Sequence, residues 1–338
     1  MNRGCDNFQE LNVLLSSCGR RVGLMDCFRS ALRDLGICGS VVAVDCSLTA
    51  PAFHLADAAW QVPRCSEPEF AQVIVELCQR ESVRLAVPTI DPELPVYAGN
   101  RDLFAAVRTA VAVSGPDTVA IAADKVRTHQ WLSEHGFATV RQAPANEALA
   151  QPSDWRFPLI AKPRRGSAGI GVAPVADLDA LRVACRGRDD LVVEEIAPGQ
   201  EYTINLFVNA SGKCICVVPH MRLEVRAGEV SKAVTAKRPA LIELGRQIGE
   251  ALPGAYGPLN VQCFVDAQGT IRVTEINPRF GGGYPIAQAA GANFPRWLIE
   301  EALGRSVWGP FDDWEDGLAM LRYDSAVFVP GRVAGLGA

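Results

Sequence analysis

Short apolar runs alternate with amphipathic stretches over the first third of the chain. Runs rich in β-branched and other apolar residues, which are typical of buried strands, lie at 12–16, 41–44, 84–87 and 111–113. Between them, apolar residues recur at helical spacing at 22–35, 69–80 and 103–108. Strands that alternate with helices predict a doubly wound, parallel sheet that is covered by helices on both faces.

The pattern changes after the turn sequence Ser114-Gly115-Pro116-Asp117. A helix with Asp124 as its N-cap is predicted next, and residues 143–154, which contain two prolines, are interpreted as a linker. Further on, apolar runs separated by short turns predict antiparallel strands, so the second half is α+β. These strands are predicted at 159–162, 171–175, 191–194, 202–208, 213–219, 259–265 and 270–275, with covering helices at 239–252 and 294–303.

The composition is that of an ordinary globular chain. Of 338 residues, 49% are hydrophobic and 21% are charged, which excludes a disordered chain or a coiled coil. The net charge of −5 argues against a nucleic-acid partner. No apolar run approaches the ~18 residues of a membrane span, and residues 1–10 lack a secretory core, so we expect neither. The 11 cysteines include no CxxC pair, which favours a reducing, cytoplasmic setting.

A glycine-rich loop follows a predicted strand that ends at Lys162. Glycines at 166, 169 and 171 allow backbone amides to approach an anion, and Arg164 and Arg165 add positive charge. The segment is not a Walker A loop, because no Lys-Ser or Lys-Thr closes the glycine run. By itself it indicates either a phosphate-binding loop or a glycine hairpin with surface cations.

A second group of polar residues lies on two predicted neighbouring strands. Glu275 and Asn277 share a strand face because they are two residues apart, and Gln262 can lie opposite them. Oxygen ligands of this kind suit Mg²⁺, and Arg279 adds a planar cation suited to phosphate. The alternative is the polar outer face of an antiparallel sheet. A third group, Glu194-Glu195 to Glu201, is either an acidic turn or a connector that offers groups to a nucleotide.

Taken together, these segments resemble the ATP-grasp superfamily over nearly the whole chain. The branch that is most similar is the stand-alone, carbamoyl-phosphate-synthase-like one. The resemblance implies a Rossmann-like pre-domain at 1–115, an ATP-grasp N-lobe with the glycine-rich lid at 116–190 and a C-lobe with the metal and nucleotide site at 191–338. The motifs that carry it are Asn12-Val-Leu-Leu-Ser-Ser-Cys-Gly-Arg-Arg-Val22, Pro88-Thr-Ile-Asp-Pro-Glu-Leu94, Asp124-Lys125, Lys162-Pro163, Gly199-Gln-Glu-Tyr202, Val225-Arg-Ala-Gly-Glu-Val-Ser-Lys232 and Glu275-Ile-Asn-Pro-Arg-Phe-Gly-Gly-Gly283.

The resemblance also implies roles for individual positions. Arg279 is expected to face the phosphoryl group that is transferred, and Gln262 stands where many relatives have an acid. The positions expected to hold ATP are Lys125 and Lys162 on the phosphates, Gly166, Ser167, Gly169 and Gly171 in the lid, Glu194, Glu195 and Ile196 near adenine, and Glu201 on ribose. The positions expected to hold Mg²⁺ or Mn²⁺ are Gln262, Glu275 and Asn277.

The acceptor site is expected between the pre-domain and the segment around Gly282. Its candidate residues from the pre-domain are Arg20, Arg21, Asp91 and Glu93, with structural ion pairs as the alternative. A dinucleotide site at the loop after the first strand is disfavoured, because the glycine pattern G-x-G-x-x-G is missing. The candidate cations beside the metal site are Arg222, Arg226 and Lys232, with a solvated charged strand as the alternative, and His220 is the histidine most worth testing.

These expectations describe an ATP- and Mg²⁺-dependent carboxylate–amine ligase that acts through an acyl phosphate on a small carboxylic or amino acid. One alternative is phosphorylation of bicarbonate or carbamate, as in carbamoyl phosphate synthase. Another is a catalytically silent ATP-binding regulatory module. The expected partners are small-molecule substrates and a second copy of the chain in a homodimer, with no nucleic acid and no membrane.

Overall fold

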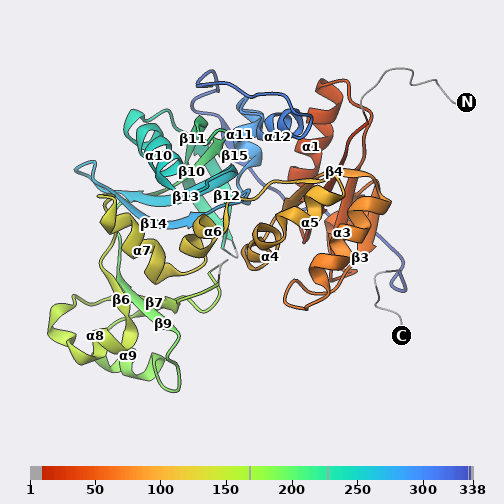
Figure 1. Cartoon of the computed structure of the whole chain (residues 1–338). Helices are drawn as coiled ribbons and strands as arrows, with labels where there is room; N and C mark the ends of the chain where they lie inside the picture. Colours follow the sequence, from red (N-terminus) through yellow and green to blue (C-terminus); the bar gives the residue numbers. More distant parts are fainter. Residues whose placement is uncertain (1–9, 167–168, 227, 334, 336–338) are drawn as a thin grey trace, which may run out of the picture.

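The structure, a computed structural model, describes residues 10–166, 169–226, 228–333 and 335 (Figure 1). The first part forms a parallel five-stranded sheet in the order β3-β2-β1-β4-β5. Its strands are β1 (Asn12–Ser16), β2 (Val41–Asp45), β3 (Ala58–Gln61), β4 (Val83–Pro88) and β5 (Ala110–Val111). The helices between them are α1 (Val22–Asp34), α2 (Pro51–Leu55), α3 (Phe70–Arg80), α4 (Leu94–Gly99) and α5 (Arg101–Ala106), with a 3-10 turn at Asp91–Glu93.

Helices cover both faces of this parallel sheet. Val13 of β1 packs in the same hydrophobic cluster as Phe28 of α1, whereas its neighbour Leu14 packs with Ile74 of α3. Successive strand residues therefore enter opposite cores, which explains why the strands read as continuous apolar runs. The Rossmann-like prediction for this part of the fold is confirmed.

A small antiparallel sheet follows, in the order β6-β9-β7-β8. Its strands are β6 (Gln142–Pro144), β7 (Leu159–Pro163), β8 (Ala173–Val175) and β9 (Leu191–Glu195). The helices of this region are α6 (Pro116–Ala122), α7 (Lys125–Glu134), α8 (Ala145–Ala150) and α9 (Leu178–Ala184), with a 3-10 turn at Pro152–Asp154. Asp124 caps α7 by accepting from the backbone N–H groups of Val126 and Arg127, as predicted.

A larger antiparallel sheet has the order β14-β13-β10-β11-β12-β15. Its strands are β10 (Gln200–Val208), β11 (Cys214–Arg226), β12 (Glu229–Thr235), β13 (Gly257–Val265), β14 (Ile271–Asn277) and β15 (Ala319–Leu321). Helix α10 (Pro239–Ala251) covers one face, and Gly245 permits its close approach, because a Cβ there would lie 2.7 Å from Val217 Cγ1. The opposite face is left for the polar residues described below.

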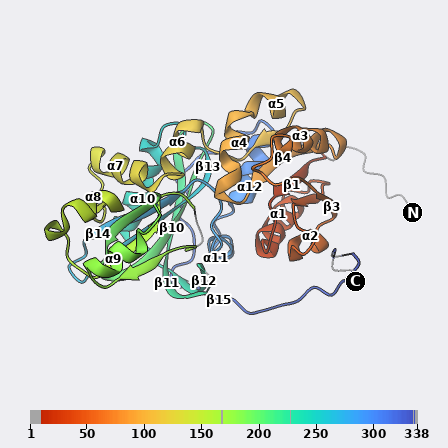
Figure 2. The same cartoon turned by 90° about the horizontal axis from the view of Figure 1, so that it is seen from below.

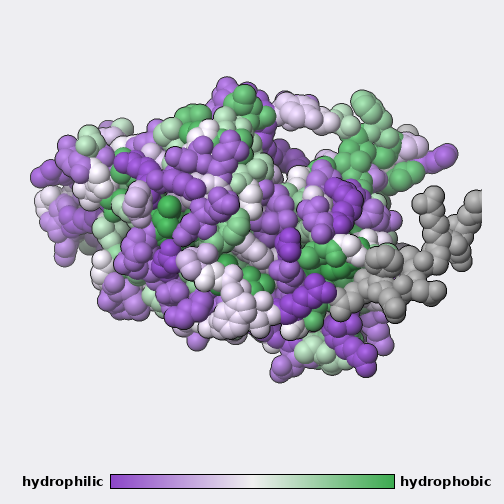
Figure 3. Space-filling view, turned by 90° about the horizontal axis from the view of Figure 1, so that it is seen from above, coloured by the Kyte–Doolittle hydropathy of each residue, from purple (hydrophilic) through white to green (hydrophobic). Residues whose placement is uncertain are grey.

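The end of the chain joins the two halves. Helix α12 (Phe294–Ala302) packs against α1 and β4 of the parallel part, and α11 (Pro285–Ala289) contacts both α1 and β12. Figure 2 shows α11 and α12 between the larger antiparallel sheet and the parallel sheet. The face seen from above is mostly hydrophilic, with hydrophobic residues scattered over it (Figure 3). Among the described helices, none combines the length and hydrophobicity that a membrane span requires.

Three of the differences from the sequence-based prediction concern the two antiparallel sheets and the helix beside the small one. The expected linker at 143–154 contains α8, whose sequence Ala-Asn-Glu-Ala-Leu-Ala is helix-forming between its flanking prolines. The region around Lys232 is the strand β12, where charged residues interrupt the apolar pattern. Strand β9 pairs with β6 and β7, so the small sheet extends to Glu195, beyond the expected boundary at 190. We propose a boundary between Glu195 and Gln200 instead.

Candidate active site

A cavity of about 640 Å³ lies where the parallel part, the small sheet and the larger sheet meet. This volume is in the range that holds a drug-sized or cofactor-sized ligand. The predicted residues that line it are Arg21, Asp91, Lys125, Lys162, Gly166, Gly169, Glu194, Glu201, His220, Arg222, Gln262, Glu275, Asn277, Arg279 and Gly282. The cavity therefore collects nearly all of the segments that the sequence analysis singled out.

The floor of the cavity is a row of polar side chains that crosses the larger sheet. Directly paired residues on antiparallel strands point to the same face of a sheet. Thr235, His220, Thr203, Gln262 and Glu275 are paired in this order across β12, β11, β10, β13 and β14. The adjoining row contains Asn205, Asn260 and Asn277, which are paired in the same way. The strand register thus brings together residues up to about 70 positions apart in the chain.

A buried ion pair forms the wall that belongs to the small sheet. Lys162 Nζ of β7 lies 2.5 Å from Glu194 Oε2 of β9, and both side chains are about one-tenth exposed. Nearby, Lys125 Nζ at the start of α7 donates to the carbonyl oxygen of Gly166 at 2.8 Å. Burial, together with the charge of Lys162, lowers the pKa of Lys125. Two lysines therefore converge on the cavity from different elements.

Glu275 faces these lysines across the cavity. Burial raises the pKa of its carboxyl group, and the positive charge of Lys125 opposes this effect. Within the described residues there is no cluster of three or more His, Cys, Asp or Glu side chains that could hold a metal ion by itself. One carboxylate with the amide oxygens of Asn277 and Gln262 nevertheless suits Mg²⁺, which usually takes few protein ligands and completes its shell with phosphate oxygens and waters.

Arg279 connects the larger sheet to the parallel part. Its guanidinium donates two hydrogen bonds of 2.7 Å to the carboxylate of Asp91, and Nη2 lies 3.3 Å from Asn277 Oδ1. Asp91 follows the end of β4, the edge at which open α/β sheets place ligands. The carboxylate of Asp91 raises the pKa of Arg279, even though burial opposes this. Arg279 is therefore a fixed cation at the junction of two parts of the molecule.

A second ion pair spans the same junction. Arg21 Nη1 lies 3.1 Å from Glu229 Oε1, and Arg322 Nη1 lies 3.0 Å from the other oxygen of Glu229. A Cβ on Gly282 would lie 2.8 Å from Glu229 Cδ, so glycine leaves room for this pair. Glu229 and Arg322 were not predicted as site residues. No local motif shows that Glu229, at the start of β12, and Arg322, near the C-terminus, come together with Arg21 of the loop after β1.

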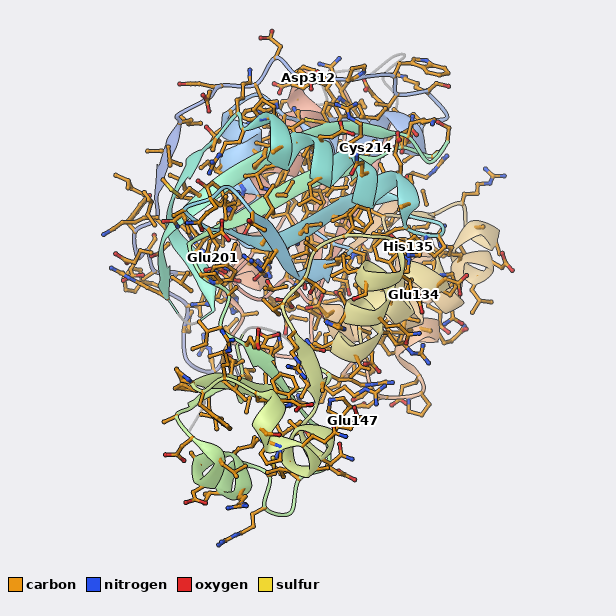
Figure 4. All side chains as sticks on the ribbon, turned by 90° about the vertical axis from the view of Figure 1, so that its left-hand side faces the viewer. Glu134, His135, Glu147, Glu201, Cys214 and Asp312 are labelled. Atoms are coloured by element: carbon orange, nitrogen blue, oxygen red, sulfur yellow. The ribbon has the colours of Figure 1, made fainter. Side chains whose placement is uncertain are left out.

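Arg222 lines the cavity beside Glu201 and Gln262. Its Nη1 donates to Glu201 Oε1 at 2.5 Å and to Gln262 Oε1 at 3.2 Å. Figure 4 shows Glu201 on the part of the larger sheet that is turned toward the small sheet. Burial raises the pKa of Glu201, and Arg222 opposes this. Arg222 therefore holds two residues that were expected to bind ribose and metal.

Some predicted residues lie away from the cavity. Lys232 and Arg226 both pair with the carboxylate of Glu224, at 2.6 and 2.7 Å, because the pairing of β11 with β12 shifts register between Arg222 and Glu224. In the loop segment, Arg164 pairs with Asp124 instead of facing the cavity. Within the described ranges, the predicted site residues that do not line the cavity are Arg20, Glu93, Gly171, Glu195, Ile196, Arg226 and Lys232, and Ser167 lies outside the described residues.

Burial, strand geometry and position in a loop explain why the other predicted residues do not line the cavity. Glu93 is completely buried and accepts hydrogen bonds from Ser16 and Ser17 and from the backbone at 89 and 90, so it holds two loops together. Glu195 follows Glu194 on a strand and points to the opposite face. Gly171 is exposed and has a φ of +73°, and a Cβ there would lie 3.0 Å from the ring of Pro163. The exposed Arg20 precedes Arg21, the arginine that reaches Glu229.

The buried, neutral His220 should make the free energy of unfolding depend on pH. Burial, with a contribution from Arg222, lowers its pKa from 6.5 to about 3. Below pH 6.5 the imidazole is protonated in the unfolded chain but stays neutral in the folded chain. The free energy of unfolding therefore decreases as pH falls from 6.5 toward 3, by up to about 1.4 kcal/mol per pH unit. Urea unfolding of the wild type and of His220→Phe between about pH 4 and 7 measures this. The stability difference between the two proteins should shrink as pH falls; parallel curves would contradict the buried neutral histidine.

Two family models match separate parts of the chain. The model described as "PylC-like, N-terminal domain" matches residues 13–112. The model described as "ATP-grasp in the biosynthetic pathway with Ter operon" matches residues 187–325. The two matches cover the parallel part and most of the larger antiparallel sheet.

Individual proteins are similar over longer stretches. The D-alanine–D-alanine ligase of Pseudomonas fluorescens is 29% identical over 216 residues, which are 57% of this chain and 66% of that protein. The chain thus spans just under two thirds of the length of this relative. A solved structure that is similar is the biotin carboxylase domain of the Hydrogenobacter thermophilus 2-oxoglutarate carboxylase, in complex with MgADP and bicarbonate. The TM-score is 0.71 at 18% identity, and the match covers 91% of this chain and 73% of the biotin carboxylase chain. The L-amino acid ligase of Bacillus licheniformis has a TM-score of 0.66 at 19% identity, with 91% and 77% covered. The two structural matches confirm the mixed fold class.

Proposed function

We propose that this chain, which belongs to the ATP-grasp superfamily, is an ATP- and Mg²⁺-dependent ligase that activates a small carboxylic or amino acid as an acyl phosphate and joins it to an amine. One observation carries the proposal. The lysine pair Lys125 and Lys162 lines one side of the cavity, and the oxygen ligands of Glu275 and Asn277 line the other, with the cation of Arg279 beside them. Cations on one side and oxygen ligands on the other are what a magnesium-bound triphosphate requires.

The nucleotide is assigned to the space between the small sheet and the larger sheet. Lys125 and Lys162 are proposed to hold the α- and β-phosphates, beneath the loop that contains Gly166 and Gly169. Glu194 and Glu201 lie on the same side of the cavity and are proposed to hold the nucleoside. Glu275, with amide oxygens from its neighbours, would hold Mg²⁺, which supplies positive charge to the phosphate oxygens.

The chemistry proceeds in two transfers. A carboxylate oxygen of the acid attacks the γ-phosphorus, and the bond from this phosphorus to the bridging oxygen of ADP breaks, so ADP leaves with the electron pair. The amine nitrogen then attacks the acyl carbon, loses a proton and expels inorganic phosphate. Arg279 supplies a fixed cation at the reacting phosphoryl group, and positioning contributes most of the remaining rate enhancement. A closed cavity protects the acyl phosphate from water.

The junction residues and the named relatives both favour one class of substrate. Asp91, Arg21 and Glu229 alternate in charge where the parallel part meets the larger sheet. Such a surface is complementary to a molecule that carries both a carboxylate and an ammonium group. The D-alanine–D-alanine ligase and the L-amino acid ligase, by their names, act on amino acids. An amino acid is therefore the substrate class that we propose to test first.

A screen of ADP release over amino acids and small carboxylic acids, each paired with amines, tests the proposed function. The expected result is ADP and phosphate release that depends on both an acid and an amine. Release with bicarbonate alone would favour the bicarbonate-phosphorylating alternative, which the similarity to a biotin carboxylase domain keeps in the test. ATP binding without ADP release under any condition would instead indicate a regulatory module. Size-exclusion chromatography with light scattering tests the proposed homodimer.

Asp91→Asn is expected to lower kcat/KM for the acceptor about 10- to 100-fold while nucleotide affinity stays unchanged. Asparagine cannot pair bidentately with Arg279 as a charged group, so the guanidinium loses its fixed position. Steady-state kinetics and calorimetric titration of ADP measure the two quantities. Asp57→Asn is the matched control, because Asp57 pairs with Arg29 on the surface. Equal kinetics for the Asp91 variant and this control would contradict the assignment.

A further inference from the structure

His220 is a buried histidine in the floor of the cavity. It lies on β11, has no exposed surface, and is paired with Thr203 of β10 and Thr235 of β12. It therefore belongs to the same transverse row as Gln262 and Glu275. Strands in a sheet lie about 4.8 Å apart, so His220 is about 10 Å from Gln262, two strands away along the row. His220 is therefore too far from Gln262 to share a metal ion with it. It lies nearer to the segment around Gly282, where the acceptor site is expected.

The imidazole has one satisfied and one unsatisfied nitrogen. Nδ1 lies 3.1 Å from Asn205 Nδ2, an amide nitrogen that can only donate, so Nδ1 accepts and the ring proton resides on Nε2. Among the residues that the structure describes, Nε2 has no hydrogen-bond partner. Burial keeps the ring neutral, with a pKa of about 3. A buried N–H group without an acceptor is uncommon in proteins and calls for an explanation.

The glycine run 281–283 lies directly over this nitrogen. A Cβ on Gly283 would be 3.1 Å from Nε2 and 2.6 Å from Val230 Cγ1, so any larger residue would cover the N–H group. A Cβ on the preceding Gly282 would be 3.0 Å from Arg21 Nη1. The glycines therefore place no side chain over the unpartnered Nε2 of His220, and they leave room for the ion pair of Arg21 with Glu229 at the same end of the cavity.

We infer that the Nε2–H group of His220 is a substrate-binding donor, which hydrogen-bonds an oxygen of the carboxylate that the enzyme activates. The inference rests on the proposed ligase function and names a subsite within the same cavity. It makes His220 a specificity residue for small acids, because the ligand oxygen must reach a fully buried nitrogen beside Gly283. The buried N–H group then has an acceptor whenever substrate is bound.

The neutral state of the ring suits this task. When one carboxylate oxygen attacks phosphorus, the other becomes the carbonyl oxygen of the acyl phosphate and loses its negative charge. A cation at that oxygen would stabilise the starting carboxylate more than the acyl phosphate, whereas a neutral N–H group can bond to both. When the amine attacks, the same oxygen becomes negative again, and a fixed donor at this position stabilises it. Arg279 provides the charged contact on the phosphoryl side.

Nuclear magnetic resonance of the full-length chain labelled with [¹⁵N]histidine tests the assignment. The chain contains four histidines, so the signal of His220 Nε2–H is identified by its absence in His220→Phe. Each acid of the ADP-release screen is added in the presence of Mg²⁺ and a non-hydrolysable ATP analogue. The expected result is that an acid which stimulates ADP release shifts this signal and slows exchange of its proton at least tenfold. A signal that no acid moves would overturn the assignment, whether or not ADP is released.

Kinetics of two variants provide the second arm. His220→Phe keeps the ring volume without the donor, and kcat/KM for the acid should fall about 10- to 1000-fold while affinity for ADP is unchanged. His220→Gln places an amide N–H group near the position of Nε2 and should recover most of this loss. His54→Gln is the matched control, since His54 lies in the parallel part and contacts the carbonyl oxygen of Leu48. If the wild type releases ADP with an acid and amine and the phenylalanine variant is unaffected, the His220 inference alone fails. If an acid shifts the Nε2–H signal but no ADP is ever released, the ligase proposal fails and the subsite stands.

Discussion

Replacing Glu275 by glutamine is expected to lower Mg²⁺-dependent ADP release at least 10²- to 10³-fold without loss of the fold. Glutamine has nearly the same shape, so the pairing with Gln262 across β13 and β14 can remain. The substitution removes the one carboxylate of the proposed ligand set and leaves only amide oxygens, which bind Mg²⁺ weakly when no charge supports them. Coupled-enzyme measurement of ADP release at several Mg²⁺ concentrations gives the result.

The control for this experiment is Glu243→Gln. Glu243 lies on α10, on the covered side of the larger sheet, and interacts with Arg246 at the surface. Both variants should unfold at nearly the same temperature as the wild type, whereas only the Glu275 variant should lose turnover. Near wild-type turnover in Glu275→Gln, with an unchanged dependence on Mg²⁺, would falsify the metal assignment.

Replacing Lys162 by methionine is expected to weaken nucleotide binding about 100-fold, or about 3 kcal/mol. The variant loses a charged donor to phosphate and also leaves the carboxylate of Glu194 buried without its partner. An unpaired buried carboxylate is costly and repels the phosphates. Adding Glu194→Gln should therefore restore part of the stability that Lys162→Met loses, although not the nucleotide affinity. Calorimetric titration of ADP and thermal unfolding measure the two effects.

Lys213→Met serves as the control for Lys162→Met. Lys213 is an exposed residue in the hairpin between β10 and β11, and it does not line the cavity in the described part of the chain. Its removal should leave both the unfolding temperature and the affinity for ADP at wild-type values. A dissociation constant for ADP that is the same in the two lysine variants would show that Lys162 does not hold the phosphates.

Local patterns were sufficient to predict most elements of the fold. The β-branched runs of β1 and β4 and the helical spacing of α1 and α3 indicate their structure within a few residues, because burial on one or both faces imposes a period on the sequence. Strand β12 was not predicted, since Lys232 and Glu229 make ion pairs where an apolar pattern was expected. Helix α8 was interpreted as a linker because its flanking prolines outweighed a short helix-forming stretch.

The candidate site was predictable where it depends on one strand or one loop. Glu275 and Asn277 are two residues apart, so any strand presents them together, and the glycines around Gly166 leave the backbone accessible in any fold. The partners of the arginines were not predictable. Arg222 and Arg226 are separated by only four residues, yet a register shift in β11 directs one toward Gln262 and the other toward Glu224.

The sequence by itself determined which residues share a face of a strand, where loops can bind an anion and which chemical groups the chain can offer. The tertiary structure alone decided that His220 stands in one row with Glu275, that Arg279 meets Asp91, and that Arg21 meets Glu229. The physical reason is the distance along the chain over which each interaction acts. Side-chain direction follows from the two-residue period of a single strand, whereas strand register and ion pairing across the cavity depend on the packing of segments far apart in the chain.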